Sequence, residues 1–149
     1  MQCVFHPVDS LREYRFVVIF TFHEGKLVLS RHRHRTTWET QGGHVEPGET
    51  PLDAAKRELW EESGAVRYTL RPLFDYWASD VIADANGQAF IADVEAFDPL
   101  PPSEMAEIRV FDTLPDNLTY PLLTPALYEE ALRATAASPQ TLKTRNRRP

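Results

Sequence analysis

The sequence predicts an α/β fold in which strands and helices pack as a layered sandwich. Two observations predict it: segments rich in aromatic and β-branched residues recur along the chain, and two segments with helical apolar spacing interleave with them. The length of 149 residues is typical of a single domain, and 42% hydrophobic residues suffice for a core. We therefore expect one domain over residues 1–136.

The first half of that domain begins with a β-hairpin. Residues 14–22 (YRFVVIFTF) form the expected strand, His23-Glu24-Gly25 the turn, and residues 26–30 the returning strand. A basic loop is expected over 31–37 and a short strand over 38–40. Gly42-Gly43 then begins a loop, rich in glycine and proline, that extends through Gly48.

Residues 51–63 carry the clearest helix signal in the chain. Thr50 suits the N-cap, Pro51 the first helical position and Asp53 the acidic position of a capping box. Gly64 is a natural C-terminal stop. The apolar stripe at helical spacing consists of Leu52, Ala55 and Leu59.

The second half continues with strands over 67–77 and 88–96, joined by a turn at Asn86-Gly87. A short strand is expected over 108–111 and a helix over 126–135. Residues 137–149 contain four basic residues and no acidic one, and we expect them to be a disordered tail.

The charge distribution restricts the functional classes. The net charge is −6 although the tail is basic, so the preceding domain is strongly acidic, which argues against general nucleic-acid binding. No apolar run is long enough to span a membrane, and no signal peptide is evident. With Cys3 as the sole cysteine, no intrachain disulfide is possible, which fits a cytoplasmic location. Oligomeric state stays open.

Three glutamates share one face of the 51–63 helix. Glu58, Glu61 and Glu62 occupy positions i, i+3 and i+4, where like charges repel unless a cation compensates. Oxygen ligands suit Mg²⁺ or Mn²⁺, and magnesium sites often include substrate phosphate oxygens. The pattern predicts such a site, completed by a backbone carbonyl near Gly43; the alternative is a solvated helix face.

The spacing around these glutamates resembles the signature of the Nudix hydrolase family. Gly43 is followed after five residues by Glu49, and after seven more by Arg57-Glu58-Leu59; Glu61-Glu62 and Gly64 follow, each after one residue. Ala65 departs from the larger aliphatic residue that the family prefers, which affects packing rather than chemistry. The resemblance extends over roughly residues 14–135 and implies the Nudix fold, a mixed sheet between helices.

The resemblance also implies roles for the signature residues. Glu58, Glu61 and Glu62 are implied metal ligands, with Glu58 or Glu61 as the base, and Glu49 is implied to pair with Arg57. Outside the signature, related enzymes often add one carboxylate; Glu104 is the first choice and Glu107 the second.

Substrate contacts are expected from the basic loop and from aromatic residues. Arg33 and Arg35 are candidate phosphate ligands, against the alternative of a solvated hairpin end. Trp38 and Tyr76 are candidates for stacking on a base, although single aromatic residues more often belong to the core.

The leading hypothesis is hydrolysis of a nucleoside triphosphate, oxidised ones included, to a monophosphate and pyrophosphate. ADP-ribose, dinucleoside polyphosphates and RNA 5′ ends are alternative substrates. A non-catalytic nucleotide sensor is less favoured because all three helix glutamates are present. Prenyl diphosphate isomerase chemistry is less favoured because Cys3 lies at the extreme N-terminus.

Overall fold

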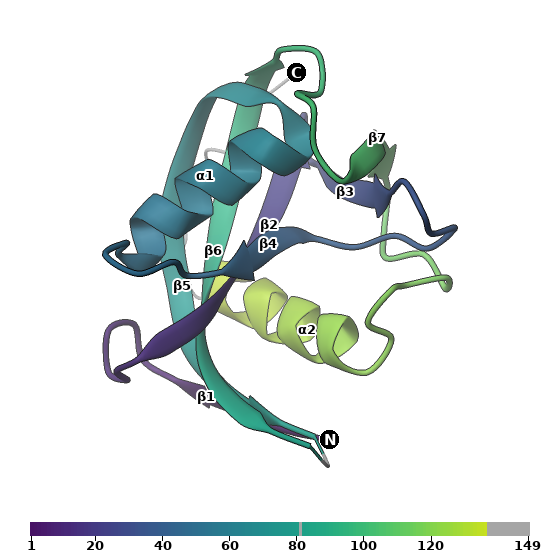
Figure 1. Ribbon diagram of the computed structural model, residues 1–149. Helices are drawn as coiled ribbons and strands as arrows, with labels where there is room; N and C mark the ends of the chain where they lie inside the picture. The colour runs from purple at the N-terminus through teal and green to yellow at the C-terminus, as the bar shows by residue number, and fades with distance from the viewer. Residues whose placement is uncertain (81, 137–149) are drawn as a thin grey trace.

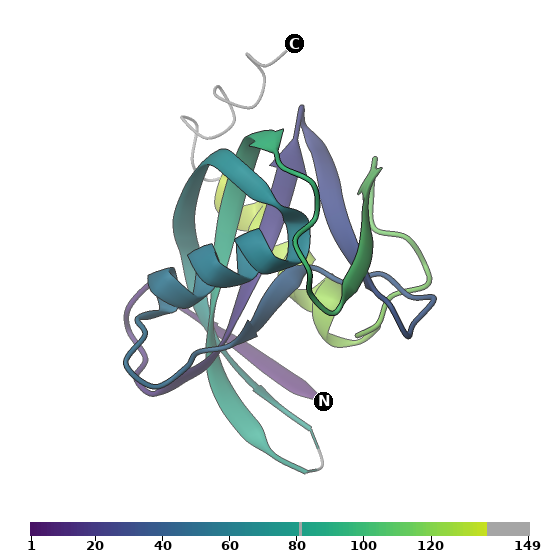
Figure 2. The ribbon, with the colours of Figure 1, turned by 45° about the horizontal axis from the view of Figure 1, so that its top comes forward.

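The computed structural model describes residues 1–80 and 82–136, which form a twisted mixed sheet with one helix on each face (Figure 1). Figure 2 shows the same sheet and its two helices from a second direction. The elements are β1 (Gln2–His6), β2 (Tyr14–His23), β3 (Lys26–His32), β4 (Gln41–His44), α1 (Pro51–Ser63), β5 (Ala65–Ser79), β6 (Asp84–Phe97), β7 (Met105–Phe111) and α2 (Leu123–Ala136).

Strand β2 is the centre of the sheet. The strand order is β1-β5-β6-β2-β3-β7, and the pairing of β2 with β6 is parallel whereas the others are antiparallel. The other edge of β2 is divided between two partners, β4 over residues 16–19 and β3 over residues 21–23. This division makes β4 an edge strand, which borders both faces of the sheet.

Helix α1 begins and ends where its end signals predict. The Thr50 side chain accepts from the Asp53 backbone N–H, and the Asp53 carboxylate accepts from the Thr50 N–H, which completes the capping box. Gly64 ends the helix with a φ of 79°, a left-handed conformation that suits glycine. These caps fix the register of the helix, and therefore the face on which its glutamates lie.

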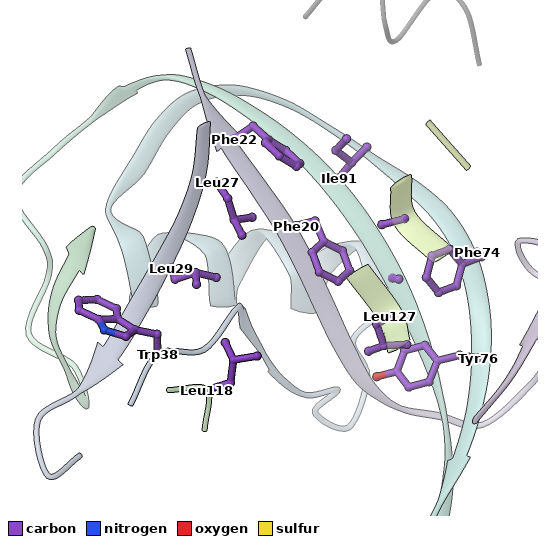
Figure 3. Close-up of a cluster of buried hydrophobic side chains, with 12 residues drawn as sticks. Phe20, Phe22, Leu27, Leu29, Trp38, Phe74, Tyr76, Ile91, Leu118 and Leu127 are labelled. Atoms are coloured by element: carbon purple, nitrogen blue, oxygen red, sulfur yellow. The ribbon is translucent and has the colours of Figure 1, made fainter. Parts of the chain in front are cut away.

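Each face of the sheet has its own hydrophobic cluster. On one face, Leu59 of α1 packs with Val17, Ile19, Phe90 and Val94 of the sheet, among others. The other face, covered by α2, is more aromatic and is drawn in Figure 3; its members include Phe20, Phe22, Trp38, Phe74, Tyr76 and Leu127. The expected α/β sandwich is confirmed. The two sides of the sheet that these helices cover are the α1 face and the α2 face.

The structure corrects three sequence-based expectations. Gly42 and Gly43 lie inside β4, not at the start of a loop, because their backbone groups pair with β2. The predicted strand at residues 38–40 amounts to two isolated bridges, one of them to Leu118. Asn86-Gly87 does not form a turn, because both residues pair with β5 inside β6; the reversal begins at Asp80.

The remaining differences concern the ends of elements. Strand β1 was not predicted, and α2 starts at Leu123, three residues before the expected start. The expected tail at 137–149 lies outside the described residues. Of the helices described, none is long and apolar enough to cross a membrane.

Candidate functional site

Arg57 joins the loop after β4 to helix α1. Its Nε and Nη2 donate to the two Glu49 oxygens at 2.7 and 2.9 Å, a bidentate geometry, and Nη2 also donates to the His44 carbonyl at 3.0 Å. Hydrogen bonds from Arg57, followed by one from the Glu46 backbone N–H, lower the pKa of Glu49 to about 2. The predicted Glu49–Arg57 pair is therefore present as an ionised pair at neutral pH.

Glu58 is held between Arg57 and Gly43. Arg57 Nη1 donates to Glu58 Oε1 at 2.7 Å. A Cβ atom placed on Gly43 would lie 2.6 Å from the same oxygen, so only glycine permits this approach of β4 to the carboxylate. Burial raises the pKa of Glu58, although Arg57 opposes the shift.

Glu62 is the most perturbed carboxylate of the site. The Gly42 backbone N–H donates to Glu62 Oε1 at 2.8 Å, and the Ser30 hydroxyl donates to the Glu62 carbonyl at 2.8 Å. Burial is the main cause that raises the pKa of Glu62 to about 9, and the nearby negative charges of Glu58, Glu39 and Glu61 raise it further. These hydrogen bonds fix the position of Glu62, but none of the ion pairs between the described residues includes its carboxylate.

Glu61 is the open member of the set. Its side chain is 46% exposed and lies 3.5 Å from Arg57 Nη1, the nearest cationic group. Within the described part of the chain, no three His, Cys, Asp or Glu side chains converge closely enough to hold a metal ion as they stand. Arg57 instead contacts both Glu58 and Glu61.

The donor set nevertheless fits a hard divalent cation. All the candidate ligands are oxygen atoms, which Mg²⁺ and Mn²⁺ prefer. The high pKa of Glu62 is the mark of a buried carboxylate beside other negative charges. A cation bound there would stabilise the ionised carboxylate against both the burial and the repulsion that raise its pKa.

A cavity of about 780 Å³ begins at this site and extends under the α2 face. At one end it touches Gly42, Gly43 and Glu62, all beside the edge strand β4. At the other end it reaches the β5–β6 hairpin and the start of α2, with lining residues that include Ala78, Asp80, Asp84 and Leu123. Its volume is within the range of small-molecule sites.

Glu39 is a buried acid on the cavity wall that the sequence analysis did not single out. It accepts from Arg35 Nη1 at 3.1 Å and from the Thr119 hydroxyl at 3.1 Å. Arg35 also lines the cavity, as a candidate phosphate ligand should. Glu39 belongs to no recognised motif, and its backbone bridge to Ser30 and its side-chain contacts with Arg35 and Thr119 place it at the site.

Three other predicted residues lie less close to the helix glutamates. The Glu104 side chain is 82% exposed and lies 3.6 Å from His32 Nε2, although Glu104 does line the cavity. Glu107 accepts from Arg31 Nε at 2.8 Å and is not among the cavity residues. Arg33 is exposed and does not line the cavity either, so the structure does not bring it to the candidate site.

Trp38 and Tyr76, the two candidates for stacking on a base, both have their rings in the core, which was the alternative interpretation of single aromatic residues. Trp38 is 4% exposed, with its ring against Phe111 and beneath the Arg109 guanidinium. Tyr76 is 2% exposed and belongs to the cluster in Figure 3. Tyr76 lines the cavity, but a ring so fully packed cannot offer a free face to a base.

The aromatic residues on the more open part of the cavity wall include Phe16, which is half-buried, and His44 and Tyr120, which are exposed. The ring centroids of Phe16 and His44 lie 4.7 Å apart, and these two residues are register partners on β2 and β4. The only sequence signal for Phe16 was its place in a strand. His44 lies within the signature, but at a position where the signature specifies no residue.

Comparisons with known proteins agree with this geometry. The family model described as the NUDIX domain matches residues 11–119. A Bacillus subtilis pyrophosphohydrolase superposes with a TM-score of 0.77 at 23% identity, covering 92% of this chain and 90% of that one. A UDP-X diphosphatase superposes with a TM-score of 0.69 at 21% identity, covering 88% and 67%. At these identities the structures show the fold alone.

Curated relatives are similar over shorter segments. An RNA pyrophosphohydrolase from Bartonella henselae is 29% identical over 112 residues, covering 64% of this chain and 65% of that protein. One from Bartonella quintana is 44% identical over 57 residues, covering 32% of each. The chain thus spans between a third and two thirds of the length of these relatives. With the family model matching most of the chain, this protein belongs to the Nudix family.

Proposed function

We propose that the protein is a magnesium-dependent pyrophosphohydrolase that cleaves a diphosphate linkage in a nucleoside 5′-triphosphate, oxidised nucleotides included. The products would be the nucleoside monophosphate and pyrophosphate. The observation that carries the proposal is the placement of Glu62, buried and short of positive charge, at the mouth of a nucleotide-sized cavity.

The residues that would hold Mg²⁺ are Glu58, Glu61 and Glu62, with the Gly43 carbonyl and, as the outer candidate, Glu104. The carboxylates would have to converge more closely than they do in the metal-free arrangement. Mg²⁺, when bound, lowers the pKa of a water ligand and neutralises diphosphate charge. Mn²⁺ offers the same chemistry.

The other residues of the site position these groups. Arg57 holds Glu58 by a 2.7 Å hydrogen bond and ties it through Glu49 to the loop after β4. Glu58 is the better candidate for the proton acceptor, because burial has already raised its pKa and the hydrogen bond from Arg57 holds it in place. Glu61, the more exposed carboxylate, is the alternative base. Arg35, on the cavity wall, would neutralise phosphate charge.

A 5′-triphosphorylated RNA end is the second candidate substrate. The matched Bartonella proteins are named RNA pyrophosphohydrolases, and an RNA 5′ end carries the same triphosphate group. Asp80 and Asp84 at the far end of the cavity count against a long RNA, because they would repel the phosphates that follow the first nucleotide.

A product assay tests the proposal. Purified protein with Mg²⁺ would be given the common nucleoside triphosphates, 8-oxo-dGTP, ADP-ribose, a dinucleoside tetraphosphate and a short 5′-triphosphorylated RNA. We expect chelator-sensitive release of pyrophosphate from a triphosphate. Retained Mg²⁺ binding without turnover of any substrate would contradict the enzyme assignment and support a nucleotide sensor.

A further inference from the structure

Four residues on four neighbouring strands form one row across the α2 face. Tyr76 on β5 pairs in register with Gly87 on β6, Gly87 pairs with Phe16 on β2, and Phe16 pairs with His44 on β4. Register partners point to the same side of a sheet. This "aromatic row" (Tyr76, Gly87, Phe16, His44) therefore runs from the far part of the cavity to the strand that carries Gly43.

Gly87 determines how the tyrosine lies in the row. A Cβ atom on Gly87 would lie 2.2 Å from Tyr76 Cζ and 2.4 Å from its hydroxyl oxygen. The phenol end of Tyr76 therefore lies directly over Gly87, toward Phe16. Any larger residue at position 87 would push the ring away, so the glycine is needed for the close approach and not for a turn.

The Tyr76 hydroxyl is a polar group on the cavity wall. The residue as a whole is 2% exposed and lines the cavity, and its oxygen has no side-chain hydrogen-bond partner among the described residues. Figure 3 shows that oxygen on the side of the ring nearer to Leu127, which is also a cavity residue. The buried side-chain atoms without a partner in the described part of the chain are Thr21 Oγ1, Gln41 Oε1 and Asp93 Oδ1, so the Tyr76 oxygen is not sealed in the core and is accessible from the cavity.

The other end of the row is open to a ligand. Phe16 is half-buried, His44 is exposed, and both line the cavity beside Gly42 and Gly43. Aromatic pairs across strands do stabilise sheets, and the contact between Phe16 and His44 needs no ligand to account for it. The additional feature is the unpaired hydroxyl at the opposite end of the same row.

We infer that the aromatic row is the nucleobase site of the substrate, with Phe16 and His44 against the base and the Tyr76 hydroxyl hydrogen-bonded to its edge. The inference rests on the proposed function for the nature of the substrate. A nucleobase is planar and carries donors and acceptors on its edge, so it suits both an aromatic wall and a single hydroxyl that faces the cavity. The row thus gives the buried ring of Tyr76 a role in hydrogen bonding, not in stacking.

Nucleoside binding without metal tests the inference apart from turnover. Adenosine, guanosine, cytidine and uridine carry no phosphate, so their affinities, measured by ligand-observed NMR in the presence of chelator, report only on the base and sugar. The variant Tyr76→Phe removes one oxygen and keeps the ring in the core. Tyr68→Phe, on the same strand but outside the cavity, is the matched control.

We expect Tyr76→Phe to weaken binding of the preferred nucleoside by roughly 3- to 10-fold, the range for one lost hydrogen bond. Phe16→Leu should weaken all bases together, and Tyr68→Phe should have no effect. Failure of the wild-type protein to bind any nucleoside at millimolar concentration would overturn the inference, as would unchanged affinity in both Tyr76→Phe and Phe16→Leu. Because neither metal nor hydrolysis enters the measurement, a protein that failed the product assay could still pass this one.

Discussion

The two faces of the sheet differ in what they offer a substrate. On the α1 side of β4 lie Arg57 and the carboxylates Glu49, Glu58, Glu61 and Glu62, held by short charged hydrogen bonds. On the α2 side, the cavity is walled largely by aromatic and aliphatic side chains. Under the proposed function, the charged groups would serve the phosphates that every nucleotide shares, whereas the apolar wall would contact the part that differs between nucleotides.

Under the proposed function, this separation would place reaction and selectivity on opposite sides of one edge strand. Strand β4 touches both, because Gly43 approaches Glu58 while His44 contacts Phe16. Side chains alternate between the two faces along a strand, so adjacent residues necessarily serve different sides. A change on one side should therefore leave the other function largely intact, and the following predictions test that independence.

The largest effect is expected from Glu62→Gln. The amide oxygen can still accept the Gly42 N–H, so the fold should survive, while turnover falls by about 10²- to 10⁴-fold through loss of the charged group. Steady-state kinetics with saturating Mg²⁺ measure this, and Glu95→Gln, an exposed acid on β6, is the control. Nucleoside binding should not change; near-normal turnover would disprove the metal assignment.

Arg57→Ala should have the next largest effect and should combine two losses. Removing the guanidinium breaks the bidentate pair with Glu49 and releases Glu58, so both thermal stability and rate should fall, the rate by roughly 10- to 100-fold. Thermal unfolding and kinetics on the same preparation measure the two. An unchanged melting temperature would show that the pair does not hold the loop to the helix.

The Gly87→Ala substitution perturbs the α2 face of the sheet. The added methyl group collides with the Tyr76 phenol, and overpacking of this kind typically costs about 1–3 kcal/mol of folding free energy. Denaturant unfolding measures the cost, and metal affinity measured by calorimetry should stay at the wild-type value. Weakened metal binding in a folded Gly87→Ala protein would show that the two faces are coupled.

The smallest effect concerns pH. The pKa of Glu62 is about 9 in the folded protein and near 4.5 in the unfolded chain. Between pH 4.5 and 9, the folded protein therefore binds a proton at Glu62 that the unfolded chain has released. Stability of the metal-free protein should therefore decrease as the pH rises from about 5 to 9. Melting temperatures in chelator check this, and both saturating Mg²⁺ and Glu62→Gln should reduce the slope. A slope identical in the variant would assign it to other groups.

The acidic site was predictable from sequence because it is local. Its residues span Gly43 to Gly64, the helical repeat puts three glutamates on one face, and two caps fix that helix in the chain. The pairing of Arg57 with Glu49 was implied by family resemblance and is present at 2.7 Å. The geometry of a helix depends on residues that are close in sequence, so the correct helix ends were sufficient to place the three glutamates on one face.

Other features depended on pairing between distant segments. Gly42 and Gly43 have low strand propensity, and only hydrogen bonds with β2 make them a strand. Asn86-Gly87 has a strong turn signal, but pairing with β5 overrides it. Glu39 and Arg35 reach the cavity through a bridge to Ser30 and a contact with Thr119 that no local pattern predicts.

The sequence by itself therefore determined the family, the α/β sandwich and the carboxylate face of α1, because periodicity and caps act over a few turns of chain. Only the tertiary structure decided that Tyr76 and Trp38 are core residues, that β4 is an edge strand and that Tyr76, Gly87, Phe16 and His44 form one row. Strand register depends on which segments meet across the sheet, and that choice is made by the packing of the whole domain.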